Sequence, residues 1–150
     1  HVLRIIRELI TIQPKSKQTN LQQSLEEFMQ KIKRRNNVFI FSDFIDASEY
    51  EKQIRILAKK HQVTGLRIFD EKETVFPDMG LVNIQDSETG EIRLINTSSA
   101  EVRKTYHQYY LDLERRFEAI FKKNNAGFLK IRSDEDYVKP LLNYFKTQKR

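Results

Sequence analysis

Of its 150 residues, 39% are hydrophobic and 32% are charged, and the formal net charge is +6 at pH 7. This length suffices for one domain with a core of its own. The chain has no cysteine, which excludes disulfides, thiolate zinc sites and cysteine nucleophiles and favours a reducing, cytoplasmic compartment. No apolar run approaches the ~20 residues that a membrane-spanning helix needs.

The excess positive charge lies at predicted helix ends rather than in one motif. Cations gather at Lys31–Arg35, Lys59–Lys60 and Lys146–Arg150, where they complement the helix dipole. A basic chain can also bind nucleic acid or anionic lipid, but no aromatic residues interleave these cations as they do in many nucleic-acid binders. We therefore favour solvated helix ends, and a basic nucleic-acid-binding module is the alternative.

The first segments predict two helices. Leu3–Ile12 repeats apolar residues at helical spacing, and Pro14 closes it. Leu21–Ile32 is amphipathic over about three turns, and either Thr19 or Asn20 could cap its start. Because the chain begins inside a helical pattern, with neither an initiator Met nor a signal peptide, we expect it to be cut from a longer protein.

Two apolar runs predict parallel strands. Val38–Phe41 is apolar on both faces, which is typical of a strand that helices cover on both sides. A capping-box pattern at Asp46–Glu49 predicts a helix that begins near Ala47, and Val63–Phe69 is the second buried strand. The alternation of helices and strands indicates βαβ crossovers and a parallel sheet.

A β-hairpin insertion is predicted near residues 75–97. The apolar stretches Leu81–Ile84 and Ile92–Ile95 flank a short loop that closes on Gly90. Such a loop favours a hairpin with Gly90 at positive φ.

The last part of the chain predicts a long helix, a short strand and a final helix. Ser98 and Glu101 form a second capping box that opens the long helix. Phe128–Ile131 is the strand, and Asp134–Asp136 caps the last helix, in which Pro140 is tolerated near the first turn. The predicted buried face of the long helix consists of Val102, Tyr106, Tyr109, Leu113, Phe117, Ile120 and Phe121.

The strongest candidate for a functional residue is Asp43, which follows Val38–Phe41 and Ser42. In open α/β sheets, ligands bind beyond the carboxyl ends of the strands. A structural role is the alternative, in which the carboxylate caps the next helix or accepts backbone N–H bonds in the loop. Ser42 is interpreted as a tight-turn residue, because no base lies near it to make it a nucleophile.

Other chemistry-bearing residues have simpler structural explanations. His1, His61 and His107 are scattered, and we expect exposed side chains and no zinc site. The segment Asp70–Glu73 is explained best as a solvated turn, although together with Asp43 it leaves open a metal-dependent nuclease or phosphohydrolase. Three tyrosines could stack on bases, but their helical spacing favours the core: Tyr106, Tyr109 and Tyr110.

Five short motifs occur in a characteristic order along essentially the whole chain. They are Ser42-Asp43-Phe44, Val63–Asp70, Asp78-x-Gly80-Leu81-Val82, Glu88-Thr89-Gly90 and Asp134-Glu135-Asp136-Tyr137-Val138-x-Pro140-Leu141-Leu142. In this order and spacing they resemble one bacterial family, the von Willebrand factor A-like family of unknown function numbered fifty-eight. Its members are often encoded beside MoxR-type AAA+ ATPases.

The resemblance implies a partial doubly wound α/β sheet, of von Willebrand A or Rossmann-like type, with a metal-ion-dependent adhesion site at its top. The family's site combines an Asp-x-Ser-x-Ser loop, a Thr before a helix and an Asp at the end of the next strand. Thr19 and Asp43 match the last two, with Asn20 where many relatives have Asp. The ion implied is Mg²⁺, whose open position takes an acidic residue of a partner protein. The implied function is a non-enzymatic protein-interaction domain that acts with an AAA+ ATPase in complex assembly or maturation.

Part of the family pattern has no counterpart here. No Asp-x-Ser-x-Ser occurs in the chain, so we expect residues 1–150 to form one incomplete domain, its C-terminal portion, with little or no Mg²⁺ bound. The strand Val38–Phe41 would also lack the neighbour that normally pairs with it. A free apolar edge is a template for association, so we expect this edge to self-associate or to be covered by the first helix.

Overall fold

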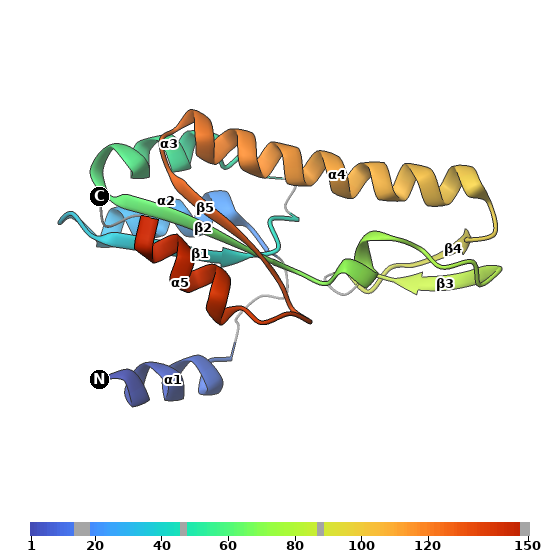
Figure 1. Cartoon of the computed structure of the whole chain (residues 1–150), viewed down its shortest axis with the longest axis horizontal. Coiled ribbons are helices and arrows are strands. Elements are labelled where there is room, and N and C mark those ends of the chain that lie inside the picture. The colour runs from blue at the N-terminus through green and yellow to red at the C-terminus, as the bar shows by residue number, and fades with distance from the viewer. Residues whose placement is uncertain (14–18, 46–47, 87–88, 148–150) are drawn as a thin grey trace.

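The structure, a computed structural model, describes residues 1–13, 19–45, 48–86 and 89–147 (Figure 1). It is an α/β fold with a parallel sheet, flanking helices and a separate hairpin, as the sequence predicts. The elements are α1 (Val2–Thr11), α2 (Leu21–Lys31), β1 (Asn37–Ser42), α3 (Glu51–Lys60), β2 (Gln62–Phe69), the 3-10 helix η1 (Glu71–Thr74), β3 (Leu81–Gln85), β4 (Ile92–Asn96), α4 (Ala100–Lys123), β5 (Gly127–Arg132) and α5 (Val138–Thr147).

The parallel sheet of the described residues has the strand order β1-β2-β5. Ile40 of β1 lies beside Gly65 of β2, which lies beside Phe128 of β5. All three strands therefore end at the same edge of the sheet, and Asp43 and Asp70 follow two neighbouring strands there.

The core lies between the sheet and helices α2, α3 and α4, while α5 covers the opposite face (Figure 1). Gly65 faces α4, where an added Cβ would lie 2.5 Å from the ring of Phe121, so only glycine permits this close approach. On the opposite face the hydroxyls of Thr64 and Tyr144 are 3.0 Å apart. The buried core cluster consists of Leu21, Leu25, Ile40, Phe44, Tyr50, Ile54, Leu57, Val63, Phe117, Ile120 and Phe121.

β1 lies at the edge of the sheet and pairs with β2 alone among the described strands. Ile40 points into the core, whereas Phe39 and Phe41 on the other face are 41% and 64% exposed. On that face Phe39 meets the ring of Phe145 edge to face at 5.8 Å. The prediction that helices cover this strand on both sides is therefore wrong, because the single helix α5 does not reach across the face. The predicted free edge is confirmed within the described part of the sheet.

β3 and β4 form an antiparallel hairpin outside the parallel sheet, with Gly90 at a φ of 76° as predicted (Figure 1). The base of the hairpin is held by Thr97, which is fully buried. Its hydroxyl accepts a hydrogen bond from the backbone N–H of Met79 and donates one to the carbonyl of Gly80, both at 2.9 Å. Arg103 of α4 donates to the Thr97 carbonyl. The hairpin is thereby attached to the start of α4.

Helix starts follow the sequence patterns in two cases and differ in two. Asn20 caps α2 through a 2.8 Å hydrogen bond from the backbone of its first turn, and Asp136 accepts the first backbone N–H of α5. The cap of α4 is Ser99, one residue after the predicted Ser98. α3 begins at Glu51, later than the capping-box pattern before it predicts; the first two residues of that pattern lie outside the described residues.

α1 forms as predicted but buries none of its residues, and Figure 1 shows it apart from the sheet. Its apolar side chains are between 46% and 81% exposed, namely Val2, Leu3, Ile5, Ile6, Leu9 and Ile10. Among the helices of the described residues, none combines the length and the apolarity that crossing a membrane requires.

Candidate functional site

Asp43 lies at the carboxyl end of β1, and its side chain is exposed. Its Oδ1 accepts a hydrogen bond from the backbone N–H of Ile45 at 3.0 Å. The hydroxyl of Ser42 accepts the N–H of Phe44 at 3.0 Å, which confirms the predicted turn role of Ser42. Phe44 adopts a left-handed backbone with a φ of 57° and is buried against Phe117, with 4.5 Å between the ring centres. The loop that carries Asp43 is therefore held by its own side chains and by the core.

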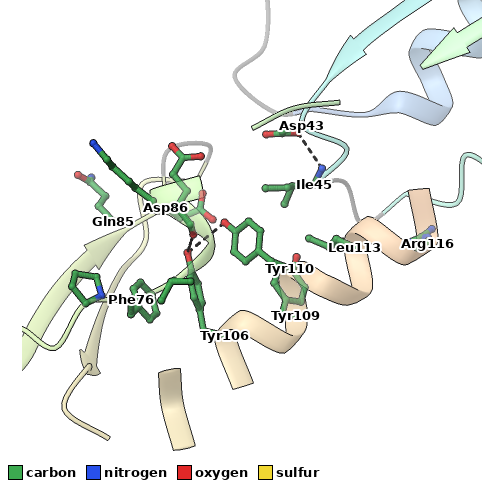
Figure 2. A pocket seen from close by; sticks show the side chains of 14 residues that line it. Asp43, Ile45, Phe76, Gln85, Asp86, Tyr106, Tyr109, Tyr110, Leu113 and Arg116 are labelled. Carbon is green, nitrogen blue, oxygen red and sulfur yellow. Dashed lines mark hydrogen bonds between the residues drawn. The ribbon is translucent and has the colours of Figure 1, made fainter. Parts of the chain in front are cut away.

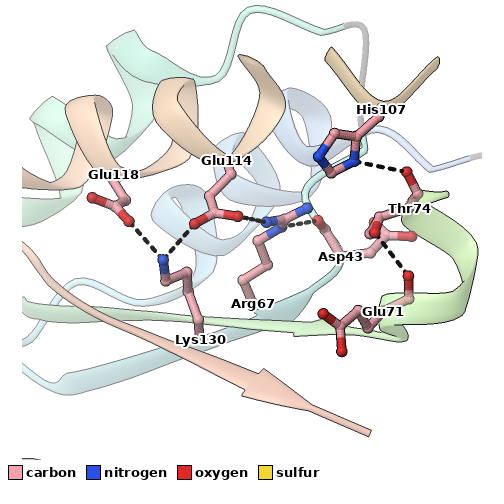
Figure 3. A network of polar contacts seen from close by, with 8 residues as sticks. All are labelled: Asp43, Arg67, Glu71, Thr74, His107, Glu114, Glu118 and Lys130. Atoms are coloured by element: carbon pink, nitrogen blue, oxygen red, sulfur yellow. Dashed lines mark hydrogen bonds and ion pairs between the residues drawn. The ribbon is translucent and has the colours of Figure 1, made fainter. Parts of the chain in front are cut away.

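A buried arginine supports this loop from beneath (Figure 3). Arg67 of β2 is 1% exposed. Its Nε donates to the backbone carbonyl of Asp43 at 3.2 Å, and its Nη1 lies 3.4 Å from Oε2 of Glu114 on α4. Lys130 of β5 joins Glu114 to Glu118, and hydrogen bonds to these two carboxylates raise the pKa of Lys130. The backbone of Asp43 is thus bound to Arg67, which belongs to an ion-pair network that connects α4 with β2 and β5.

A cavity of about 830 Å³ opens beside Asp43, between the loop after β1, the η1 segment, the hairpin and α4 (Figure 2). Phe76 and Tyr106 both line it, and their rings stack on each other with 3.6 Å between their centres. The Tyr106 hydroxyl donates to the carbonyl of Glu73 at 2.8 Å and lies 3.3 Å from the Tyr110 hydroxyl. Burial, the contact with Tyr106 and the charges of Glu73 and Asp43 raise the pKa of Tyr110, which stays a neutral phenol.

The cavity is lined by charges of both signs, with carboxylates in excess. Asp43, Glu73 and Asp86 come from three different elements, and Lys72 and Arg116 also line it. Arg116 is directed away from the centre of the cavity in Figure 2 and donates to a backbone carbonyl of the β1–α3 loop at 3.2 Å. The remaining lining residues are apolar, aromatic or neutral polar: Ile45, Val75, Phe76, Pro77, Gln85, Tyr106, Tyr109, Tyr110 and Leu113.

The second predicted metal ligand, Thr19, lies exposed immediately before the cap of α2. The first turn of α2 contacts the loop that follows Asp43, through a 3.4 Å hydrogen bond from Gln22 N to Ser48 Oγ. The start of α2 therefore contacts the loop after β1 at Ser48, and Thr19 and Asp43 would supply one hydroxyl and one carboxylate. Within the described ranges, no three His, Cys, Asp or Glu side chains gather to hold a metal ion. Mg²⁺ prefers six oxygens, so this pair is not a complete Mg²⁺ site.

Two expectations about single side chains are wrong. His61 is 4% exposed, packs against the ring of Phe28 and accepts the N–H of Asn36 on its Nδ1 at 3.2 Å. Burial, with a smaller effect of Lys60, lowers the pKa of His61. The tyrosines of α4 line the cavity instead of the core, and Tyr109 is 51% exposed.

Two further predictions about single residues, the exposure of His107 and the turn at Asp70, are confirmed. His107 is exposed, and its Nδ1 lies 3.3 Å from the carbonyl of Thr74. Asp70 accepts the N–H of Lys72 at 2.9 Å, as expected of a residue in a solvated turn.

Comparison with known proteins gives a family but no activity. An uncharacterized protein of Mycobacterium avium is 25% identical over 118 residues, which are 79% of this chain and 69% of that protein. An uncharacterized protein of Mycobacterium tuberculosis is 24% identical over 121 residues, 79% of this chain and 37% of that relative. The chain thus spans little more than a third of the longer relative, and no solved structure matches it significantly. Residues 1–116, which include every residue that lines the cavity, match the family described as a protein of unknown function, DUF58, and the chain belongs to that family.

Proposed function

We propose that the chain is a non-enzymatic protein-interaction domain whose recognition edge is the Asp43 loop and the cavity beside it. The observation that carries this proposal is an exposed carboxylate at the carboxyl edge of a parallel sheet, held from beneath by buried Arg67 and bordered by a cavity of about 830 Å³. Ligands of open α/β sheets bind at this edge. A rigid, partly aromatic cavity with a few charged groups is typical of a binding site.

In a longer protein, Mg²⁺ would assist this recognition. Asp43 and Thr19 would hold the ion together with oxygens from a part of the protein outside this chain. The ion would supply a fixed coordination position for an acidic residue of the partner. Within this chain, the contribution of Arg67 is to fix the backbone of Asp43, so that the carboxylate keeps its direction when a partner binds.

The partner that we propose is a MoxR-type AAA+ ATPase. Together the two proteins would act in the assembly or maturation of a protein complex in the cytoplasm. The support is the order of motifs that resembles the von Willebrand A-like family. Membership of DUF58 is compatible with this partner and does not identify it.

Metal titration tests the proposed role of Asp43. A longer chain, extended upstream, should bind Mg²⁺ in a calorimetric titration, and Asp43→Ala should abolish the binding. Asp112→Ala removes an exposed carboxylate of α4 outside the cavity and is the matched control, for which an unchanged affinity is expected. Unchanged affinity in Asp43→Ala would contradict the assignment of this residue.

A metal-dependent nuclease or phosphohydrolase is the second candidate. One observation favours it, because Asp43 and Asp70 follow neighbouring parallel strands at one edge of the sheet. It predicts cleavage of DNA or of a generic phosphoester with Mg²⁺ or Mn²⁺, and loss of cleavage in both Asp43→Asn and Asp70→Asn. An assay without turnover removes this candidate and leaves the interaction domain.

A further inference from the structure

We propose that the cavity beside Asp43 binds a basic peptide segment, with an arginine or lysine side chain of the partner between the tyrosines of α4 and the carboxylates of the facing loops. The inference rests on the proposed function, because it takes the ligand to be part of a protein. Binding of a basic peptide requires no metal ion, so the inference and the metal-assisted proposed function can be tested and contradicted independently.

The aromatic walls of the cavity provide the first argument. Phe76 and Tyr106 form a stacked pair, and Tyr109 and Tyr110 both line the cavity from α4 with their rings edge to face at 5.7 Å (Figure 2). Tyr109 is 51% exposed although it belongs to the predicted apolar stripe. Aromatic faces attract ammonium and guanidinium groups, most strongly when the cation is partly desolvated. The walls are therefore suited to an organic cation.

The distribution of carboxylates provides the second argument. Asp43 and Glu73 form no ion pair with any described residue, whereas Glu114, Glu118 and Asp134 elsewhere in the chain are all paired. The acidic residues line the cavity from three elements, so a peptide segment with more than one basic side chain could pair with more than one carboxylate. Such charge-assisted hydrogen bonds are the stronger kind.

The two cations that line the cavity do not cancel this charge. Arg116 is engaged with Glu49 at 3.4 Å, with the carbonyl of Ser48 and with the ring of Tyr50. Lys72 is then the lining cation left to oppose Asp43 and Glu73, while Asp86 also interacts with Arg93, which does not line the cavity. The cavity therefore keeps an excess of negative charge in a chain whose formal net charge is +6.

The size of the cavity favours a peptide over a free amine. At about 830 Å³ it is in the upper part of the range of ligand sites. One basic side chain fills a small part of this space, so the residues beside it in a peptide would occupy the rest.

Fluorescence polarisation tests the inference with the folded chain in the presence of EDTA. The probe is a fluorescein-labelled peptide that carries two arginines among glycine and serine residues, compared with the same peptide carrying glutamine or glutamate instead. We expect the arginine peptide to bind roughly tenfold more tightly than the glutamine peptide. Glu73→Gln and Tyr109→Ala should each weaken its binding by a factor of about three to thirty.

Matched controls exist for both variants. Glu71→Gln removes a neighbouring carboxylate of η1 that pairs with Arg132 and does not line the cavity, and Tyr137→Ala removes an exposed tyrosine elsewhere. Both should bind the arginine peptide like the unmodified chain. Urea unfolding of all four variants confirms that each one is folded before its affinity is compared.

Several results would overturn the inference. They are equal affinity for the arginine and glutamine peptides, equal effects of Glu73→Gln and Glu71→Gln, or displacement of the peptide by spermidine at the same concentration as by unlabelled peptide. The proposed function can still hold in that case. It would be supported if the upstream-extended chain binds the glutamate peptide only with Mg²⁺ and loses this binding in Asp43→Ala. If the arginine peptide does not bind in the same series, the basic-peptide inference alone is overturned.

Discussion

At the residue scale, the most consequential side chain is Arg67, because its charge is buried and its partners come from distant parts of the chain. We expect Glu114→Gln to lower the free energy of unfolding by about 3 kcal/mol, since it leaves a buried guanidinium without its carboxylate. Glu118→Gln is the matched control. It also removes a partner of Lys130 but does not touch Arg67, and it should cost about 1 kcal/mol or less. If urea unfolding gives the same loss of stability for Glu114→Gln and Glu118→Gln, the contact between Glu114 and Arg67 does not account for the loss.

His61 gives the chain a pH-dependent stability. Burial lowers its pKa in the folded state below the ordinary value of 6.5, so the unfolded chain binds the proton more readily. The stabilising contribution is therefore complete above pH about 6.5 and is lost as the pH falls from there toward the folded pKa.

His61→Asn keeps an acceptor for the N–H of Asn36 and removes the titration. Urea unfolding at several pH values between about 7.5 and about 5.5 should show a slope in the unmodified chain that is smaller in His61→Asn. His107→Asn changes an exposed histidine and should retain the slope. If the free energy of unfolding of His61→Asn keeps the same slope against pH, the pH dependence comes from groups other than His61.

The sequence places Asp43 correctly because strand ends follow from local patterns. It does not reveal Arg67 or the burial of His61, since these depend on contacts that are remote in the chain. Arg67 meets Glu114, 47 residues away, and His61 meets Asn36, 25 residues away. A charged residue inside the apolar run Val63–Phe69 is the one local signal that could have indicated a buried arginine.

At the scale of elements, the hairpin β3–β4 supplies Gln85 and Asp86 to the cavity. The hydrogen bonds of Thr97 at its base hold it in this position. Thr97→Val keeps the shape of the side chain but leaves the N–H of Met79 without its hydroxyl acceptor. The expected cost is about 1 to 3 kcal/mol. Hydrogen exchange should become faster in the hairpin, residues 81–96, while the strands β1, β2 and β5 stay protected.

The control for this prediction is Thr105→Val, which changes an exposed threonine of α4. It should leave the exchange of the hairpin unchanged. Faster exchange in the parallel sheet as well would mean that the Thr97 contacts support the whole fold and not the hairpin alone.

Element type was predictable here, whereas burial was predictable only in part: Phe117, Ile120 and Phe121 are buried as expected, but Tyr109 on the same predicted face is exposed. Apolar patterns predict the five α-helices and the five strands that the structure describes, but the exposure of a face depends on which elements are present to cover it. This is why α1 forms but buries none of its residues, and why the second face of β1 is only partly covered. The cap of α4 shifted because the Ser98 hydroxyl donates to Asp78, which leaves Ser99 to accept from the helix.

At the scale of the whole molecule, the parallel topology separates the charges. Each of α2, α3 and α4 precedes a strand of the sheet, so their basic C-terminal turns lie toward the amino ends of the strands. Asp43 and the cavity lie at the opposite, carboxyl edge. The basic helix ends therefore lie away from the carboxylates of the cavity. A partner that contacts both edges of the sheet would need acidic groups for one edge and basic groups for the other.

The free edge of β1 gives the last prediction, on association. Beside the exposed rings of Phe39 and Phe41, the outer edge of β1 pairs with no other described strand. Such an edge is a template for strand pairing, so we expect the chain to self-associate as its concentration rises. Phe41→Lys should reduce this association, because a lysine on an edge strand opposes pairing. Ile56→Lys makes the same charge change on the exposed surface of α3 and should have little effect. Sedimentation velocity over a range of concentrations measures the difference. A monomer at all concentrations, with exchange protection along Val38–Phe41, would instead mean that the chain covers this edge itself.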